Sequence, residues 1–177
     1  ENLVAFQKFV ADIKETCMKE NGFEPVVIMQ ATHSGRYSKP HGTPAPLIAY
    51  NNPIFEGDHP ISSDRILSDD YLMALEEKFG EAAKLAERAG FDGVDIKCCH
   101  RYLNSELLSA YTREGAFGGS LDNRTRLLRH GVKNAMDATG KDFIVTSRLN
   151  VYDGFVHPYG WGVRPEGGKI GRASCRG

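Results

Sequence analysis

The sequence predicts an α/β protein built on a parallel β-sheet. Segments with apolar residues at helical spacing alternate with short apolar runs, in the order helix, strand, helix, strand, helix, strand. This alternation is typical of right-handed βαβ units. Each apolar run also ends in a polar residue, Gln30, Lys97 or Arg148. Three strands are too few for a closed barrel, which takes about 250 residues, so the 177 residues form either a small open sheet or a piece of a barrel.

The first helix is expected at residues 2–21, with Gly22 suited to its end. Its apolar positions at helical spacing are Phe6, Phe9, Val10, Ile13 and Cys17. Residues 25–30, Pro-Val-Val-Ile-Met-Gln, follow as a buried strand because β-branched residues favour strands. Residues 38–68 are rich in Pro, Gly, Asn and Asp without a clear period. A loop of this length in a compact domain is usually functional or a lid.

The second helix is expected at residues 69–89 and is stopped by Gly90. Its buried stripe consists of Leu72, Leu75, Phe79, Ala82, Ala83 and Ala86. A central buried strand containing Val94 and Ile96 comes next. The chain then turns polar abruptly, at Lys97, His100 and Tyr102. Because ligands sit at the carboxyl ends of parallel strands, these three side chains mark a candidate active site.

The last third of the chain repeats this arrangement. A short helix is expected at residues 104–111, a glycine-rich loop at 112–120 and a third helix at 121–139. A third apolar strand follows at 142–148, and the rest of the chain reads as loop.

Composition excludes several classes of function. A net charge of −1 does not favour nucleic acid or a membrane surface as a partner, and no apolar run is long enough to span a bilayer. The four cysteines lack the spacing of a disulfide scaffold or a zinc site, and the consecutive residues Cys98, Cys99 and His100 do not converge on one tetrahedral ion. We therefore expect no metal, a small-molecule substrate and a reducing, cytoplasmic location. The oligomeric state is not predicted.

Four motifs occur in order along the chain. They are Gln-Ala-Thr-His-Ser-Gly-Arg at 30–36, Ala-Gly-Phe-Asp-Gly-Val-Asp-Ile-Lys-Cys-Cys-His-Arg-Tyr-Leu at 89–103, Phe-Gly-Gly-Ser-Leu-Asp-Asn-Arg at 117–124 and Ser-Arg-Leu-Asn at 147–150. Together they resemble the Old Yellow Enzyme family, the FMN-dependent NADH:flavin oxidoreductases that include the 2,4-dienoyl-CoA reductases. The resemblance implies a fragment of a TIM (β/α)₈ barrel, about strands three to five with their helices. It also implies FMN as cofactor and NADH or NADPH as electron donor, with hydride delivered to an activated alkene or enoyl substrate.

The resemblance also assigns roles to individual residues. Gln30 matches the amide on the pyrimidine edge of the flavin, and Arg148 matches the cation beside flavin N1 and O2. Lys97 and His100 occupy the pair that binds the substrate's carbonyl oxygen, and Lys97 also borders the cofactor. Tyr102 matches the general acid that protonates the α-carbon.

Some residues depart from the family pattern. Lys97 stands where histidine is usual, and Arg101 replaces a glycine. A lysine at a barrel strand end with a tyrosine nearby also fits a Schiff-base aldolase or lyase, which is the alternative reading of Lys97. A third possibility is an inactive fragment of an enzyme.

The ends of the chain fit the fragment reading. Residues 170–177 have no apolar periodicity and resemble the translation of a sequencing adapter. We expect residues 1–168 to be a partial FMN-binding barrel domain and 169–177 to be a non-native tail. Missing barrel strands are expected to leave Val94, Ile96 and Ile144 poorly buried and the fragment inactive.

Overall fold

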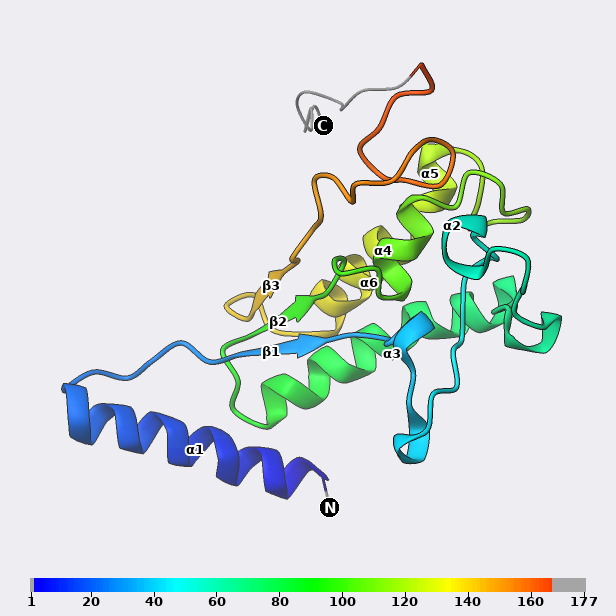
Figure 1. Ribbon diagram of the computed structural model, residues 1–177. Coiled ribbons are helices and arrows are strands. Elements are labelled where there is room, and N and C mark those ends of the chain that lie inside the picture. Colours follow the sequence, from blue (N-terminus) through cyan, green and yellow to red (C-terminus); the bar gives the residue numbers. More distant parts are fainter. Residues whose placement is uncertain (1, 167–177) are drawn as a thin grey trace. The chain divides into compact units, whose positions relative to one another are not determined.

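The computed structural model describes residues 2–166 (Figure 1). These residues form two compact units. The first contains residues 2–31, 75–96 and 129–147, and the second contains residues 32–74, 97–128 and 148–166. The predicted boundary at residue 168 and the predicted tail at 169–177 lie outside the described residues. Within residues 2–166, no helix has both the length and the apolar character needed to cross a membrane.

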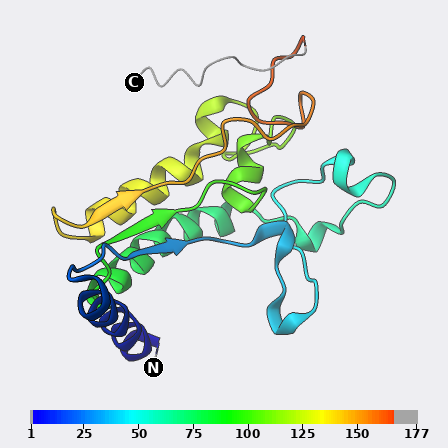
Figure 2. The same cartoon turned by 60° about the vertical axis from the view of Figure 1, so that its left-hand side comes forward.

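The first unit is built on a parallel sheet, as predicted. Its strands are β1 (Ile28–Ala31), β2 (Gly93–Ile96) and β3 (Ile144–Thr146), in the spatial order β1-β2-β3. Both pairings are parallel. Figure 2 shows the strands side by side in chain order. The sheet and its helices therefore have the organisation of a piece of a (β/α)₈ barrel.

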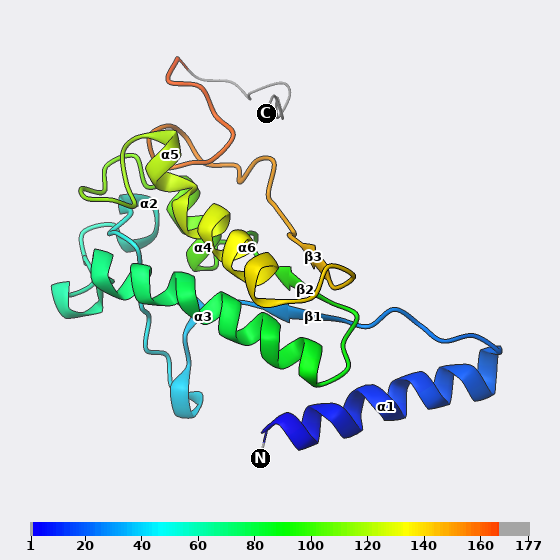
Figure 3. The ribbon, with the colours of Figure 1, turned by 180° about the vertical axis from the view of Figure 1, so that it is seen from behind.

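Helices cover one face of this sheet. They are α3 (Asp69–Arg88) and α6 (Arg126–Ala138), whose first turns belong to the second unit. Figure 3 shows both in front of the strands, on the same side. Most of the predicted apolar stripe of α3 is buried, with Phe79 at 4% and Ala83 at 0% exposure, whereas Leu75 and Ala82 are half-buried. Helix burial against a sheet is the main stabilising term in such units because apolar area leaves water.

The prediction that Val94 and Ile96 lose burial is wrong, since both are fully buried. Side chains alternate between the faces of a strand. Val94 and Ile96 therefore share one face of β2, and Gly93 and Asp95 lie on the other. The open face is the one that carries Ile28 (40% exposed) and Ile144 (42% exposed). The expectation of poor burial is thus confirmed for Ile144 alone.

Glycine at position 93 permits a close approach of β2 to β3. A Cβ atom built at Gly93 would lie 2.5 Å from the carbonyl oxygen of Ile144 and 2.7 Å from its Cβ. Real Cβ atoms do not come so close to a backbone atom. Glycine at position 93 of the Asp-Gly-Val sequence therefore fits this strand spacing better than any residue with a side chain.

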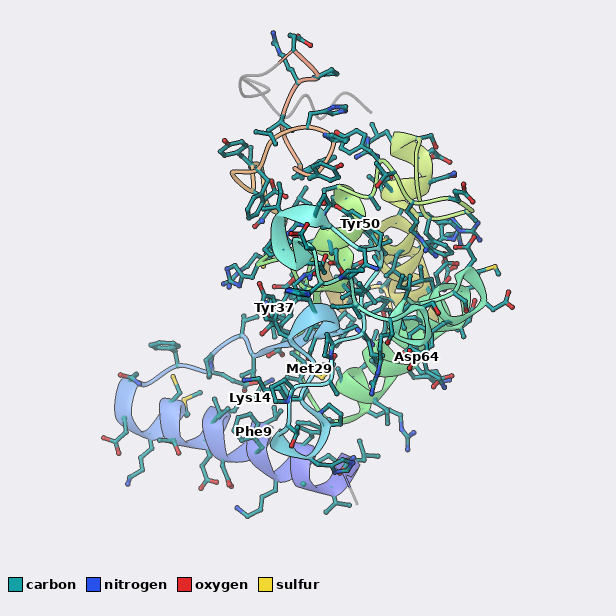
Figure 4. All side chains as sticks on the ribbon, turned by 45° about the vertical axis from the view of Figure 1, so that its right-hand side comes forward. Phe9, Lys14, Met29, Tyr37, Tyr50 and Asp64 are labelled. Atoms are coloured by element: carbon teal, nitrogen blue, oxygen red, sulfur yellow. The ribbon has the colours of Figure 1, made fainter. Side chains whose placement is uncertain are left out.

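The first helix, α1 (Asn2–Asn21), has the predicted bounds but buries little of its apolar stripe. Val10 is buried, and Phe6 and Phe9 are exposed. An ion pair ties α1 to the start of β2, because Lys14 (labelled in Figure 4) donates to Asp92 at 2.8 Å. The same carboxylate accepts a bond from the backbone of Val27 at 2.7 Å.

The second unit holds the short helices. These are α2 (Pro53–Glu56), α4 (Leu103–Leu108) and α5 (Leu121–Arg124), with 3₁₀ turns at Gly35–Tyr37, Pro40–Gly42 and Ser63–Arg65. The long loop predicted at 38–68 therefore contains short helical turns.

The single helix predicted at residues 121–139 is wrong, because it divides into α5 and α6. Thr125 lies at the division, and both its backbone N–H (3.0 Å) and its hydroxyl (2.8 Å) donate to the carbonyl of Leu121. A threonine hydroxyl that bonds the carbonyl four residues back often bends a helix.

Candidate active site

The chain reverses direction just beyond β2 in a tight turn. The N–H of Tyr102 donates to the carbonyl of Cys99 at 3.3 Å, and the two residues between them have positive φ, 61° for His100 and 59° for Arg101. Two consecutive positive φ values define a type I′ turn, which favours Gly, Asn or Asp. Non-glycine residues in this region are strained, and such strain clusters at functional sites.

Hydrogen bonds hold this turn in place. The side chain of Asn104 donates to the carbonyl of Lys97 at 3.2 Å. Cys98 pairs in parallel with the segment after β3, since its N–H donates to the carbonyl of Arg148 at 2.9 Å and its carbonyl accepts from Asn150 at 3.1 Å. The backbones at Lys97 and Arg148 are thereby fixed beside each other in the second unit.

The structure brings Lys97 and Tyr102 together. The Lys97 ammonium lies 3.5 Å from the centroid of the Tyr102 ring, which is a cation–π contact. Lys97 is buried at 8% exposure. The ring of Tyr37, labelled in Figure 4, lies 5.5 Å from that of Tyr102 in a tilted arrangement. Two predicted site residues, Lys97 and Tyr102, are therefore in contact, and the ring of Tyr37 lies beside them.

The other predicted site residues have different surroundings. The His100 side chain is exposed on the turn, and within residues 2–166 it makes no hydrogen bond to Lys97 or Tyr102. Arg148 is also exposed. Gln30 is exposed on the open face of β1, where its side chain donates to Asp95 of β2 at 3.1 Å. Gln30 and Asp95 are register partners across the strands.

Sequence reasoning did not identify the buried role of Arg101. Its guanidinium donates to Ser109 at 2.8 Å and to Asp153 at 2.6 Å, and it lies 5.0 and 5.2 Å from the ring centroids of Phe55 and Phe155. Arg101 is 6% exposed. Its partners come from distant segments of the chain, so the replacement of the family's glycine was the one signal available.

His33 and Arg36 of the first motif are half-buried polar groups of the second unit. Arg36 pairs with Glu56 and with Glu106, whose carboxylate also accepts from the backbone of Ala49 at 3.0 Å. Burial raises the pKa of Glu106, and the charge of Arg36 opposes that increase.

His33 is held as a neutral imidazole. Its Nδ1 accepts from the N–H of Gly35 at 3.0 Å, and its Nε2 lies 3.0 Å from the hydroxyl of Tyr71. Burial lowers the pKa of His33. Gly35 itself has a φ of 58°, and a Cβ there would lie 2.9 Å from the backbone nitrogen of Leu103. Gly35 of this motif therefore packs directly against the start of α4.

The parallel sheet with helices on one face places this chain in the class of α/β barrel proteins. The chain belongs to the NADH:flavin oxidoreductase / NADH oxidase family, whose sequence profile matches residues 1–159. The resemblance to the Old Yellow Enzyme family is thereby confirmed. The family does not favour the Schiff-base alternative for Lys97.

Individual relatives agree with this membership. The NADPH dehydrogenase of Clostridium acetobutylicum is 31% identical over 129 residues, which is 72% of this chain and 37% of the relative. The cinnamate reductase of Clostridium sporogenes is 34% identical over 90 residues, 49% of this chain and 14% of the relative. The structure of Old Yellow Enzyme from Pichia sp. AKU4542 superposes with a TM-score of 0.63 at 26% identity, covering 86% of this chain and 41% of that chain. The chain thus spans less than half the length of these relatives.

Proposed function

We propose that the full-length protein carrying this chain is an FMN-dependent oxidoreductase that reduces an activated alkene or enoyl substrate with NADH or NADPH. The observation that carries the proposal is the buried Lys97 ammonium against the Tyr102 ring, at the end of β2 in a chain of this family. The cinnamate reductase among the relatives acts, by its name, on a conjugated alkene, which is in keeping with this proposal.

The residues present fit FMN by their chemistry. The exposed carboxamide of Gln30 both donates and accepts, as the pyrimidine edge of a flavin requires, and Arg148 supplies a permanent cation where negative charge would develop. FMN, when bound, accepts hydride from the nicotinamide and passes it to the substrate. We further propose that β1, β2 and β3 are strands three, four and five of the barrel, and that this fragment alone is inactive.

Tyr102 is proposed as the general acid. Its phenol would protonate the α-carbon while Lys97 and His100 polarise the carbonyl oxygen of the substrate. Because the Lys97 ammonium lies 3.5 Å from the ring, its positive charge stabilises the anion that remains after Tyr102 gives up its proton.

The test is Tyr102→Phe in the flavin-loaded, full-length protein. Loss of a general acid slows alkene reduction by about 10²-fold or more. Reduction of the flavin by NAD(P)H should keep its rate, because that half-reaction needs no proton from Tyr102. Tyr37→Phe is the matched control, since it removes a neighbouring exposed hydroxyl. An unchanged rate of alkene reduction in Tyr102→Phe would show that the assigned role is wrong.

A further inference from the structure

The ammonium of Lys97 is a buried charge without an anionic partner among residues 2–166. Three other cations with little exposure in the second unit are paired with carboxylates, and a fourth, Arg124, donates to the backbone carbonyls of Leu108 and Gly119. Arg36 contacts Glu56 and Glu106, Arg101 contacts Asp153, and Arg113 contacts Asp69. Burying a charge is costly unless an opposite charge compensates it. The cation–π contact with Tyr102 offsets part of this cost and leaves the charge without a counter-ion.

The surroundings of Lys97 indicate what kind of anion completes the pair. The rings of Tyr102 and Tyr37 lie 5.5 Å apart, and Tyr37 is 45% exposed, so a partly open aromatic surface adjoins the ammonium. Aromatic faces favour flat, conjugated groups. A neutral imidazole, which the family usually has at this position, donates one hydrogen bond, whereas an ammonium brings a full charge and three donors.

We infer that Lys97 recognises the carboxylate of a conjugated substrate, so that the enzyme prefers α,β-unsaturated carboxylates to neutral enones. This inference rests on the proposed function and names its substrate class. A carboxylate activates an adjacent double bond poorly because its negative charge resists the electrons of the incoming hydride. Contact with the ammonium neutralises that charge and removes the obstacle.

Reduction of the bound unsaturated carboxylate conserves electrons and protons. NADH or NADPH is oxidised and supplies two electrons with the hydride that bonds to the β-carbon of the alkene. The π-electron pair moves to the α-carbon and the carboxylate, where Lys97 faces the added charge. The α-carbon then takes a proton from Tyr102, and solvent returns that proton to Tyr102. The product is the saturated carboxylate.

The experiment compares cinnamate with benzylideneacetone, its methyl-ketone analogue, in the flavin-loaded, full-length protein. Lys97→Met keeps the length of the side chain and removes its charge, and Lys97→Arg keeps a charge. Lys39→Met, at an exposed position of the same unit, is the matched control. We expect Lys97→Met to lower kcat/KM for both substrates, because Lys97 faces the oxygen of either, and to lower it at least about tenfold more for cinnamate than for the ketone, because only cinnamate loses a charge pair. Lys97→Arg should retain most of the cinnamate activity, and Lys39→Met should change neither value.

A binding measurement keeps this inference separable from the proposed function. Hydrocinnamate, which has no double bond to reduce, is titrated by calorimetry into the wild type and Lys97→Met. The inference requires its Kd to rise at least about tenfold in the variant, the cost of losing a charge pair. If that rise occurs but no substrate is turned over, the proposed function fails and the recognition by Lys97 stands. Equal losses for cinnamate and the ketone, a loss of flavin in Lys97→Met, or no binding of hydrocinnamate to the wild type would each overturn the inference.

Discussion

Replacing Arg101 should separate two opposing contributions to stability. Its backbone has a φ of 59°, which costs an L-residue about 1–2 kcal/mol. Its guanidinium pairs with Asp153, whose side chain is 2% exposed. Removing one partner of a buried ion pair costs about 3–5 kcal/mol because the other charge stays buried alone. Arg101→Ala keeps the strained φ and loses the pair, so it should lower the free energy of unfolding by about this amount.

Arg101→Gly loses the same ion pair but relieves the backbone. Glycine adopts positive φ freely, but it loses more conformational entropy on folding, which lowers the stability by about 0.5–1 kcal/mol. Arg101→Gly should therefore be more stable than Arg101→Ala, by up to about 1 kcal/mol. Adding Asp153→Asn to either variant should restore part of the loss, because the lone buried charge disappears.

Urea unfolding of the full-length protein, with flavin bound in every sample, measures these differences. Two results would refute the reasoning. If Arg101→Ala stays within about 0.5 kcal/mol of the wild type, the ion pair contributes little. If Arg101→Gly is less stable than Arg101→Ala, the positive φ is not a source of strain.

Two further predictions concern the first motif and the sheet. The pKa of His33 is lowered from 6.5 by burial, so its stabilising contribution is complete above pH 6.5 and is lost as the pH falls below that value. The free energy of unfolding is measured between pH 7 and 5, on either side of the ordinary histidine pKa of about 6.5. As the pH falls, it should decrease less in His33→Asn than in the wild type. Gly93→Ala should destabilise the protein by about 1–3 kcal/mol in the same assay because its Cβ overlaps Ile144. A neutral effect of Gly93→Ala would mean that β3 moves away from β2 at little cost.

The parts of the fold that depend on local periodicity could be predicted from the sequence. The bounds of α1 were predicted to the residue, and α3 ends one residue before its predicted end. The parallel order of the strands followed from the alternation of helices and strands. The two predictions that were wrong concern features that the spacing of apolar residues does not determine. The division at Thr125 follows from one hydroxyl bond, and the burial of Val94 follows from which face of β2 the helices cover.

The candidate site could be predicted only as far as its strand ends. Lys97 and Tyr102 follow β2 directly, and their contact is local. The importance of Arg101 depends on Asp153, 52 residues later, and on rings from two other segments. No local pattern indicates such a contact, so the sequence offered only an unusual residue at a position where the family has glycine.

We propose that these strand ends belong to a flavin enzyme that reduces conjugated substrates. Anaerobic absorbance spectroscopy of the full-length protein tests it most directly. The account predicts a yellow protein whose flavin bleaches on addition of NADH or NADPH and regains its colour when cinnamate is then added. A protein that binds no flavin, or a reduced flavin that neither cinnamate nor benzylideneacetone reoxidises, would contradict the account.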